Sequence, residues 1–441
     1  MPDTESLAAR IADRIRPGEM SSVVWATAWF FFILLGYLIV RPVRETMGSI
    51  GGTRQLQGLM AVTFVAMLVA VPIYSALVAR LPRRWLVRVV FHFFAACLFA
   101  FFVLMRIDHE STQVWTARAF FVWVNVFAFF ATSVFWSVLA DLFTSEQGKR
   151  LFGLVAAGGT AGAITGSIIT SRLAGVLSTS WLLLIPIVML EVGLACAWRL
   201  EKQIAKRPLS PDRYAPAGDD KPTGGGLMSG ITQVFQSRYL ATICVFLLCA
   251  QACGTQLYFE QAEIVNATIE TKEERTQLFA HLDLGAQVLT LLTQALLSSV
   301  ILRRFGVAVT LVILPIVYAV GFASLAFHPT LATLMVTMIA TRATGYGITV
   351  PAREVLFTVV SREEKYKSKS FIDTVVMRGG DAMSGQIFGS LRAIGFSFAA
   401  LNLAVLPAVG IWAYVAMRLG KQQKERQDQQ QPLVEQSSEQ S

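Results

Sequence analysis

The sequence predicts an all-α integral membrane protein with twelve transmembrane helices in two repeats of six. Of its 441 residues, 54% are hydrophobic and only 15% are charged, whereas soluble domains average about 25% charged residues. Twelve stretches are apolar over the ~20 residues that a helix needs to cross a bilayer. Water does not tolerate so many apolar runs on one surface. The composition therefore excludes a soluble enzyme, a nucleic-acid-binding domain and a disordered protein.

The twelve apolar runs fall into two sets of six. The first set is expected at residues 22–46, 56–79, 85–105, 114–141, 152–175 and 181–199. The second set is expected at residues 238–262, 279–302, 307–327, 330–360, 370–393 and 396–418. Several runs contain glycine, proline or an ionisable residue, which favours a packed bundle around a polar cavity over a set of simple anchors.

Polar segments divide the chain into five parts. Residues 208–226 read PLSPDRYAPAGDDKPTGGG, a composition typical of linkers. We therefore expect an N-terminal segment, a six-helix bundle, a linker, a second bundle and a disordered tail, at residues 1–21, 22–199, 200–237, 238–418 and 419–441. The five cysteines lie inside apolar runs without metal-type spacing and are expected to be buried hydrophobes.

The distribution of basic residues predicts the orientation. The net charge is +9, and Lys and Arg gather in cytoplasmic connections of membrane proteins. The connection at His328-Pro329 has neither. The even-numbered connections hold Arg80, Arg83, Arg84, Lys149, Arg150, Lys202, Lys206, Arg207, Arg213, Lys221, Arg303, Arg304, Arg362, Lys365, Lys367 and Lys369. We expect a bacterial inner-membrane protein with both termini in the cytoplasm.

The first helix ends in a charged motif, YLIVRPVRETMG, at residues 37–48. Arg41, Arg44 and Glu45 follow 18 residues without a charge. Arginine at membrane depth is costly unless it meets an anion or lines water, and the two arginines share a helix face. They are therefore candidate anion ligands. The alternative is that they snorkel to lipid headgroups at the membrane interface.

The tenth helix repeats part of this motif. Pro351, Arg353 and Glu354 match the P-x-R-E pattern that begins at Pro42. Each proline can kink its helix and is followed by an Arg-Glu pair. A repeat in two helices expected to face one cavity favours a functional role.

Other charged residues are weaker candidates. Asp141, at the inner end of the fourth helix, is a candidate for a coupling proton or for a structural ion pair. Arg378 and Asp381 are three residues apart and can pair, and Asp283 and Glu260 are lesser candidates. Possible secondary or gating residues are Tyr37, Trp136, Lys149, Lys365, Lys369, Asp373, Arg378 and Asp381.

A glycine run marks the fifth helix. Gly158, Gly162 and Gly166 recur every fourth residue, but the Lys-Ser/Thr of a phosphate loop does not follow. Close helix packing is the favoured interpretation. Since the sequence has no zinc-site spacing and no nucleophile–base pattern, we expect neither a cofactor nor enzymatic activity.

The sequence resembles a broad superfamily in its architecture and a narrower family in its motifs. Two halves with a long central loop are similar to the major facilitator architecture, in which helices 1, 4, 7 and 10 line a central cavity. Within it, the chain resembles the nucleotide transporters that include the ATP/ADP translocases of plastids and intracellular bacteria. The resemblance rests on Tyr37, Arg41, Arg44, Glu45, Phe135, Trp136, Asp141, Lys149, Arg150, Pro351, Arg353, Glu354, Lys365, Lys367, Lys369, Ile372 and Asp373.

This chain departs from the nucleotide transporter pattern at three places. The family has lysine at Arg44 and glutamate at Asp141, and it has an acidic residue at Thr255 or Gln256. The resemblance implies a small anionic substrate, with Arg41, Arg44, Glu45, Asp141, Arg353 and Glu354 as binding residues.

Two main functions, and a third outside transport, remain open. The leading hypothesis is an antiporter of nucleotides or related phosphorylated anions, because an empty cavity with excess positive charge would be costly to occlude. The alternative is a proton-coupled transporter of a drug, siderophore or peptide, in which Asp141 and Glu354 titrate. A sensor or assembly scaffold is the third.

Overall fold

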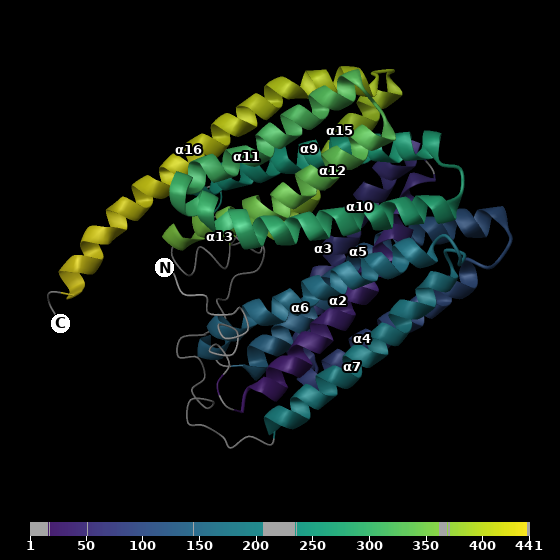
Figure 1. Cartoon of the computed structure of the whole chain (residues 1–441), viewed down its shortest axis with the longest axis horizontal. Coiled ribbons are helices and arrows are strands. Elements are labelled where there is room, and N and C mark those ends of the chain that lie inside the picture. The colour runs from purple at the N-terminus through teal and green to yellow at the C-terminus, as the bar shows by residue number, and fades with distance from the viewer. Residues whose placement is uncertain are drawn as a thin grey trace, which may run out of the picture. The chain divides into compact units, whose positions relative to one another are not determined.

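The computed structural model describes residues 16, 18–50, 52–143, 145–205, 234, 236–360, 368 and 371–438. Within these residues every regular element is helical, and no strand occurs. The predicted all-α fold class is therefore confirmed (Figure 1).

The first six predicted runs are continuous helices in the structure. They are α2 (Met20–Ser49), α3 (Gly52–Arg80), α4 (Arg83–Leu104), α5 (Glu110–Leu142), α6 (Ser145–Leu173), and the short η1 (Trp181–Leu183) that leads into α7 (Leu184–Ala205). Most extend several residues beyond the predicted apolar runs, because helix geometry continues into the polar flanks that hydropathy excludes.

The second six runs are more broken. They consist of α9 (Arg238–Thr268), α10 (Lys272–Leu292), η3 (Thr293–Ser298), α11 (Ser299–Phe327), α12 (Leu331–Thr344), η4 (Gly345–Thr349), α13 (Val350–Leu356), η5 (Phe357–Val359), η6 (Ile372–Val376), α15 (Met377–Ala393) and α16 (Phe398–Ser438). Gly306 interrupts α11 with φ 76°, a backbone conformation that glycine adopts without steric cost. The predicted boundary between residues 302 and 307 coincides with this break.

Nine stretches in the described part of the chain are long and apolar enough to cross a membrane. One of them, Lys272–Phe327, contains both helices that Gly306 separates. The predicted spans at 330–360 and 370–393 are helical but are not among the nine. Short π and 3₁₀ segments break them up, and each carries several ionisable residues.

The described chain forms two compact units. Unit 1 contains Met1–Met47, Val69–Asp220 and Thr271–Leu284, and unit 2 contains Gly48–Leu68, Lys221–Glu270 and Gly285–Ser441. The units draw most of their residues from the two predicted bundles, but the first part of α3 groups with unit 2 and the first part of α10 with unit 1. The sequence carried no signal for these two assignments.

Unit 1 has an aromatic core in which α2 and α6 approach closely. Phe30 and Phe135 stack with ring centroids 4.3 Å apart, and Trp29 lies 4.9 Å from Phe135. A Cβ atom on Gly162 would lie 2.1 Å from the carbonyl oxygen of Phe31, which is nearer than any side chain allows. The glycine run therefore packs one helix backbone against another, as predicted.

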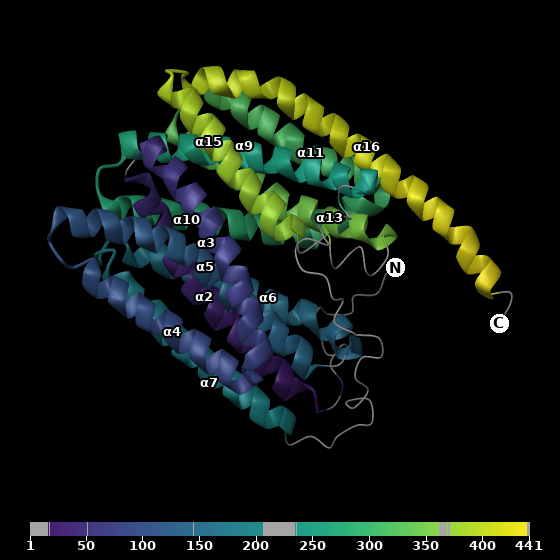
Figure 2. The same ribbon diagram turned by 180° about the vertical axis from the view of Figure 1, so that it is seen from behind.

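Unit 2 is built around α9, which packs against α15 and α16; both views of the ribbon show these helices adjacent (Figure 2). The Tyr239 hydroxyl donates to the Leu356 carbonyl at 2.8 Å, which ties α9 to α13. Gln57 of α3 donates to the Gln386 side chain of α15 at 2.8 Å.

Helix α16 continues as far as Ser438, whereas the sequence analysis expected a tail without structure after residue 418. The added residues are rich in Gln, Lys, Glu and Arg, which are good helix formers in isolation. The N-terminal segment and the linker fall largely outside the described residues, so their boundaries stay predictions.

Candidate functional site

The strongest charged cluster lies at the end of α2, inside unit 1. Arg41 contacts Asp283 of α10, with Nη1 and Oδ1 3.5 Å apart, and it lies 3.9 Å from Glu45. Arg44 pairs with Glu45 and donates to Oδ1 of Asn125 on α5 at 3.2 Å. We call Arg41, Arg44, Glu45 and Asp283 the α2 cluster.

The α2 cluster is buried and its charges balance. The side chains of Arg41 and Arg44 are 14% and 12% exposed, and those of Glu45 and Asp283 are 2% and 1% exposed. Two guanidinium groups therefore face two carboxylates away from solvent. This is not the arrangement of arginines that snorkel to headgroups, because a snorkelling side chain exposes its charged end.

Local sequence explains why these side chains meet. Pro42 lies inside α2 without ending it, so Arg41, Arg44 and Glu45 stay on one continuous helix, where Arg41 and Glu45 are one turn apart. Asn125 fixes its own amide by donating to the Phe121 carbonyl at 2.9 Å. Its oxygen is thereby directed at Arg44, whose guanidinium also lies 5.8 Å from the Phe121 ring centre.

The predicted aromatic candidates have packing partners. Trp136 contacts Phe30 and Phe152 within the unit 1 core, at centroid distances of 5.3 and 5.6 Å. Tyr37 is partly buried and its ring lies 6.5 Å from Phe127. Both rings serve the core in this structure, and a stacking role toward a substrate stays a prediction.

Asp141 does not join the α2 cluster. It is exposed at the end of α5, 16 residues from Asn125, a separation of about 24 Å along a helix. That end of the unit instead holds Glu19, which accepts from Gln147 at 2.9 Å and from Arg150 at 3.0 Å. Burial tends to raise the pKa of Glu19, but these hydrogen bonds and the charge of Arg150 lower it below 4.5.

Unit 2 holds the second predicted Arg-Glu pair. Arg353 lies 3.6 Å from Glu354, and its Nη1 is 3.7 Å from the Met377 sulfur. Glu354 is 41% exposed at its side chain, so this pair is more open than the α2 cluster.

The pairing predicted within the eleventh helix is present. Arg378 lies 3.7 Å from Asp381, whose other oxygen accepts from Gln251 of α9 at 2.6 Å. Four predicted residues cannot be placed: Lys365 and Lys369 and the side chains of Lys149 and Asp373 lie outside the described residues.

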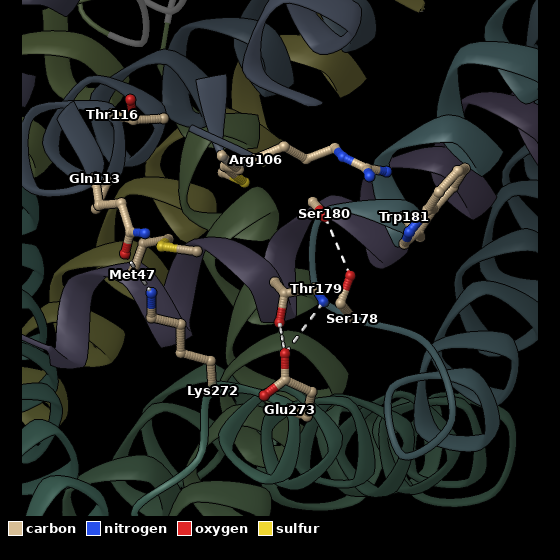
Figure 3. A pocket seen from close by; sticks show the side chains of 12 residues that line it. Met47, Arg106, Gln113, Thr116, Ser178, Thr179, Ser180, Trp181, Lys272 and Glu273 are labelled. Carbon is tan, nitrogen blue, oxygen red and sulfur yellow. Dashed lines mark hydrogen bonds between the residues drawn. The ribbon is translucent and has the colours of Figure 1, made fainter. Parts of the chain in front are cut away.

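A polar pocket of about 330 Å³ opens in unit 1 (Figure 3). Its walls come from the connections around α4–α5 and α6–α7, the end of α2 and the start of α10. Arg106 lies over the Trp181 ring at 4.8 Å, Lys272 donates to Gln113 at 3.2 Å, and Glu273 accepts from Thr179 at 3.5 Å. Helices α2 and α10 contribute to both this pocket and the α2 cluster, while α5 lines the pocket and carries Asn125, which contacts Arg44.

Sequence reasoning missed several of these partners. Asn125 lies in an apolar run and Glu19 in a segment read as a polar tail, so neither carried a signal. Asp283 was only a lesser candidate, because its pairing with Arg41 connects helices that are far apart in the sequence. The pocket residues on the connections had no motif that could have identified them.

Comparison with known proteins shows the fold family. Three solved structures with the same fold are a bacterial homologue of the human lysosomal transporter Spinster, the nucleoside transporter NupG and a D-xylose–proton symporter. In that order, their sequence identities to this chain are 14%, 13% and 11%, and their TM-scores are 0.59, 0.52 and 0.59. Each match covers 92% of this chain, and the matches cover 98%, 99% and 97% of the three solved chains. At these identities the likeness concerns the fold alone.

No curated protein matches this chain. A family model described as Major Facilitator Superfamily matches residues 20–368. The match covers most of the twelve helices and is consistent with the apolar spans described above. The chain is therefore a multi-pass membrane protein of the secondary-transporter type, and it belongs to the Major Facilitator Superfamily.

Proposed function

We propose that this chain carries a small phosphorylated anion, such as a nucleotide, across the bacterial inner membrane by alternating access, with both termini in the cytoplasm. The observation that carries the proposal is the pair of arginines, Arg41 and Arg44, which lie on one face of α2 with only 14% and 12% of their side chains exposed. Guanidinium groups bind phosphate through two parallel hydrogen bonds and are over-represented where such recognition is needed.

Glu45 pairs with both arginines, and Asp283 pairs with Arg41. An anion that enters can replace a carboxylate as the guanidinium partner, because phosphate oxygens accept hydrogen bonds in the same forked geometry. Asn125 then keeps Arg44 aligned from the α5 side. Arg353 with Glu354, within unit 2, is proposed separately as an anion contact.

The charge balance changes the expected coupling. The sequence analysis based exchange on an excess of positive charge in the empty site, but the α2 cluster has two carboxylates for its two arginines. Charge alone therefore does not prevent the empty carrier from reorienting. When an anion displaces Glu45 or Asp283 from a guanidinium group, that buried carboxylate loses a cationic partner, and proton uptake would lower the resulting cost. Anion transport driven by a proton gradient is thus a second outcome alongside nucleotide exchange.

A proton-coupled transporter of another solute is the alternative. It is favoured by the same two carboxylates, since buried acidic groups in membrane helices mark proton pathways as often as substrate sites. In this case the arginines would be structural partners only.

The test is uptake of labelled ATP by the protein reconstituted in liposomes, under three conditions: empty vesicles, ADP-loaded vesicles, and empty vesicles with an inward proton gradient. Uptake confined to ADP-loaded vesicles supports nucleotide exchange. Uptake into empty vesicles that requires the gradient supports anion–proton symport. Absence of ATP uptake in all three conditions, with folded protein, overturns the nucleotide substrate and directs the screen to other phosphorylated anions.

Variants assign the site. We expect Arg44→Ala to reduce uptake about 100-fold, because truncating one partner of a buried charge pair costs about 3 kcal/mol or more. Arg353→Ala tests the contact in unit 2 separately. Arg83→Ala is the matched control, since Arg83 pairs with Glu201 at 3.4 Å and its side chain is 37% exposed. Wild-type flux in Arg44→Ala and Arg353→Ala would contradict the site.

A further inference from the structure

A buried carboxylate on α9 has no function in the site above. Glu260 has 0% of its surface exposed. Both of its oxygens accept hydrogen bonds from Nδ2 of Asn402 on α16, each at 3.0 Å. Asn402 is also 0% exposed, so the pair lies in the interior of unit 2.

The partner of this carboxylate is neutral. Within the described residues Glu260 forms no ion pair, and the cation whose charge reaches it is Arg392 of α15. Arg392 is committed elsewhere: it pairs with Glu263, donates to the Phe396 carbonyl at 2.6 Å and lies over the Phe398 ring.

Three further charged groups on helices packed against α9 are Asp381, Arg342 and Arg426, and Arg426 of α16 lies over the Tyr239 ring at 4.6 Å. Asp381 of α15 accepts from Gln251 and pairs with Arg378. Arg342 of α12 lies within electrostatic reach of Tyr318. Among the described residues, an ionised Glu260 would therefore be a buried charge held by an amide, with Arg392 as a cation that does not pair with it. Proteins seldom keep a buried charge without a direct ion pair unless the group is neutralised.

An amide oxygen one helical turn from Glu260, Oε1 of Gln256, lacks a hydrogen-bond donor among the described residues. Nε2 of Gln256 donates to Oδ1 of Asn402 at 3.2 Å, while Oε1 of Gln256 is buried and has no hydrogen-bond donor among the described residues. Gln256 is also 0% exposed. It lies four residues before Glu260, on the same face of α9. Among the described residues, the face of α9 that carries Glu260 therefore has one buried acceptor without a donor.

We propose that Glu260 is a proton-binding site in the membrane-spanning part of unit 2, with Asn402 and Gln256 as positioning residues. Nδ2 of Asn402 donates to both carboxylate oxygens and Oδ1 accepts from Gln256, so the Asn402 oxygen is not a ligand for a metal cation at Glu260. A carboxyl group that is neutral while α9 and α16 are packed, and that ionises when water reaches it, would couple proton movement to the transport cycle.

The experiment is infrared difference spectroscopy of the full-length protein in lipid nanodiscs. We expect a carboxyl C=O band near neutral pH that shifts in D₂O and disappears as pH rises. Glu260→Gln should remove this band, while Glu260→Asp should retain it at a shifted frequency. A band that persists unchanged in Glu260→Gln, or the absence of any such band in wild type, overturns the proposal.

Control variants exclude neighbouring groups. Glu263→Gln changes a partly exposed carboxylate in the next turn, and Asp283→Asn changes the buried carboxylate of the α2 cluster; neither should remove the Glu260 band. Asn402→Ala should shift its frequency and move its titration midpoint, which a purely structural role would not do in a folded protein. The same titration in sodium chloride and in choline chloride tests for a cation site: a sodium-dependent loss of the band would overturn the assignment to a proton.

This measurement uses no transported solute. Its failure therefore leaves the anion proposal intact, and failure of ATP uptake leaves the proton site intact.

Discussion

Glu45 in unit 1 and Glu260 in unit 2 are both buried glutamates on long membrane helices, yet their surroundings are opposite. Glu45 meets the guanidinium groups of Arg41 and Arg44, whereas Glu260 meets the amide of Asn402. Their exposures are similarly low, at 3% and 0%. Burial alone therefore does not decide the chemistry of a membrane carboxylate.

The difference lies in what each carboxylate can exchange. A competing anion can replace Glu45 as the partner of its arginines, because a guanidinium group donates paired hydrogen bonds to phosphate as well as to carboxylate. Glu260 forms no ion pair within the described residues, so the change proposed for it is the gain or loss of a proton. On the two proposals above, unit 1 and unit 2 carry distinct kinds of site, one for the charge of a solute and one for a proton.

The largest expected effect is that of Glu45→Gln on stability. This variant leaves two buried arginines with one carboxylate, and breaking a buried pair typically costs about 3–5 kcal/mol. Equilibrium unfolding in detergent measures the loss. Added ATP should restore stability to the variant more than it stabilises wild type, because the anion replaces the missing carboxylate.

A matched control keeps this result interpretable. Glu201→Gln removes the partner of Arg83 from a half-exposed pair, and such pairs contribute about 0–1 kcal/mol. Equal losses in Glu45→Gln and Glu201→Gln would contradict the buried, balanced cluster.

The next effect concerns the shape of the cation rather than its charge. Arg44→Lys keeps a positive charge beside Glu45 but loses the planar fork and the paired hydrogen bonds. We expect transport to fall about tenfold, equivalent to about 1.4 kcal/mol, with a smaller change in stability than in Glu45→Gln. The measurement is the rate of uptake of labelled ATP, or of the phosphorylated anion that the screen identifies. An unchanged rate would mean that Arg44 acts only as a structural counter-ion.

A third buried glutamate tests the comparison by pH. Glu19 is held by Gln147 and Arg150, which lower its pKa below the unfolded value of 4.5 despite burial. A lowered folded-state pKa contributes stability that is present above the unfolded pKa and is lost as pH falls through the folded pKa. Glu19→Gln should therefore flatten the loss of stability below about pH 4.5, measured as the difference between wild-type and variant unfolding curves. Wild-type and variant stabilities that fall in parallel with pH would show that Glu19 does not contribute to the acid-dependent loss of stability.

Sequence predicted the helices better than it predicted the contacts. Hydropathy located the twelve runs, including the break beside Gly306, because each run is a local property of about twenty residues. The Arg-Glu pairs and the glycine packing were also local, at helical spacing. The partnership of Arg41 with Asp283, and that of Glu260 with Asn402, depend on helices brought together by tertiary packing, so no local pattern encodes them.

Charge balance was the property that sequence reasoning could not reach. Counting Arg41 and Arg44 against Glu45 suggested an excess of positive charge, and the missing negative charge came from Asp283 on α10. Similarly, Gln256 looked like the loss of an acidic residue, whereas the structure has a buried acid one turn later on the same face of α9. In both cases the charge of a site depends on residues that tertiary packing brings together, not on one motif.

The smallest expected effect completes the comparison. Glu260→Gln keeps the size of the side chain and an oxygen that accepts from Asn402, and it removes no ion pair. We therefore expect stability at neutral pH to change by no more than about 1 kcal/mol, the net value of one ordinary hydrogen bond. The measurement is the same detergent unfolding series as for Glu45→Gln, and the informative quantity is the difference between the two variants. If Glu260→Gln were as destabilising as Glu45→Gln, Glu260 would have to be ionised against a cation, and the distinction between the two glutamates would fail.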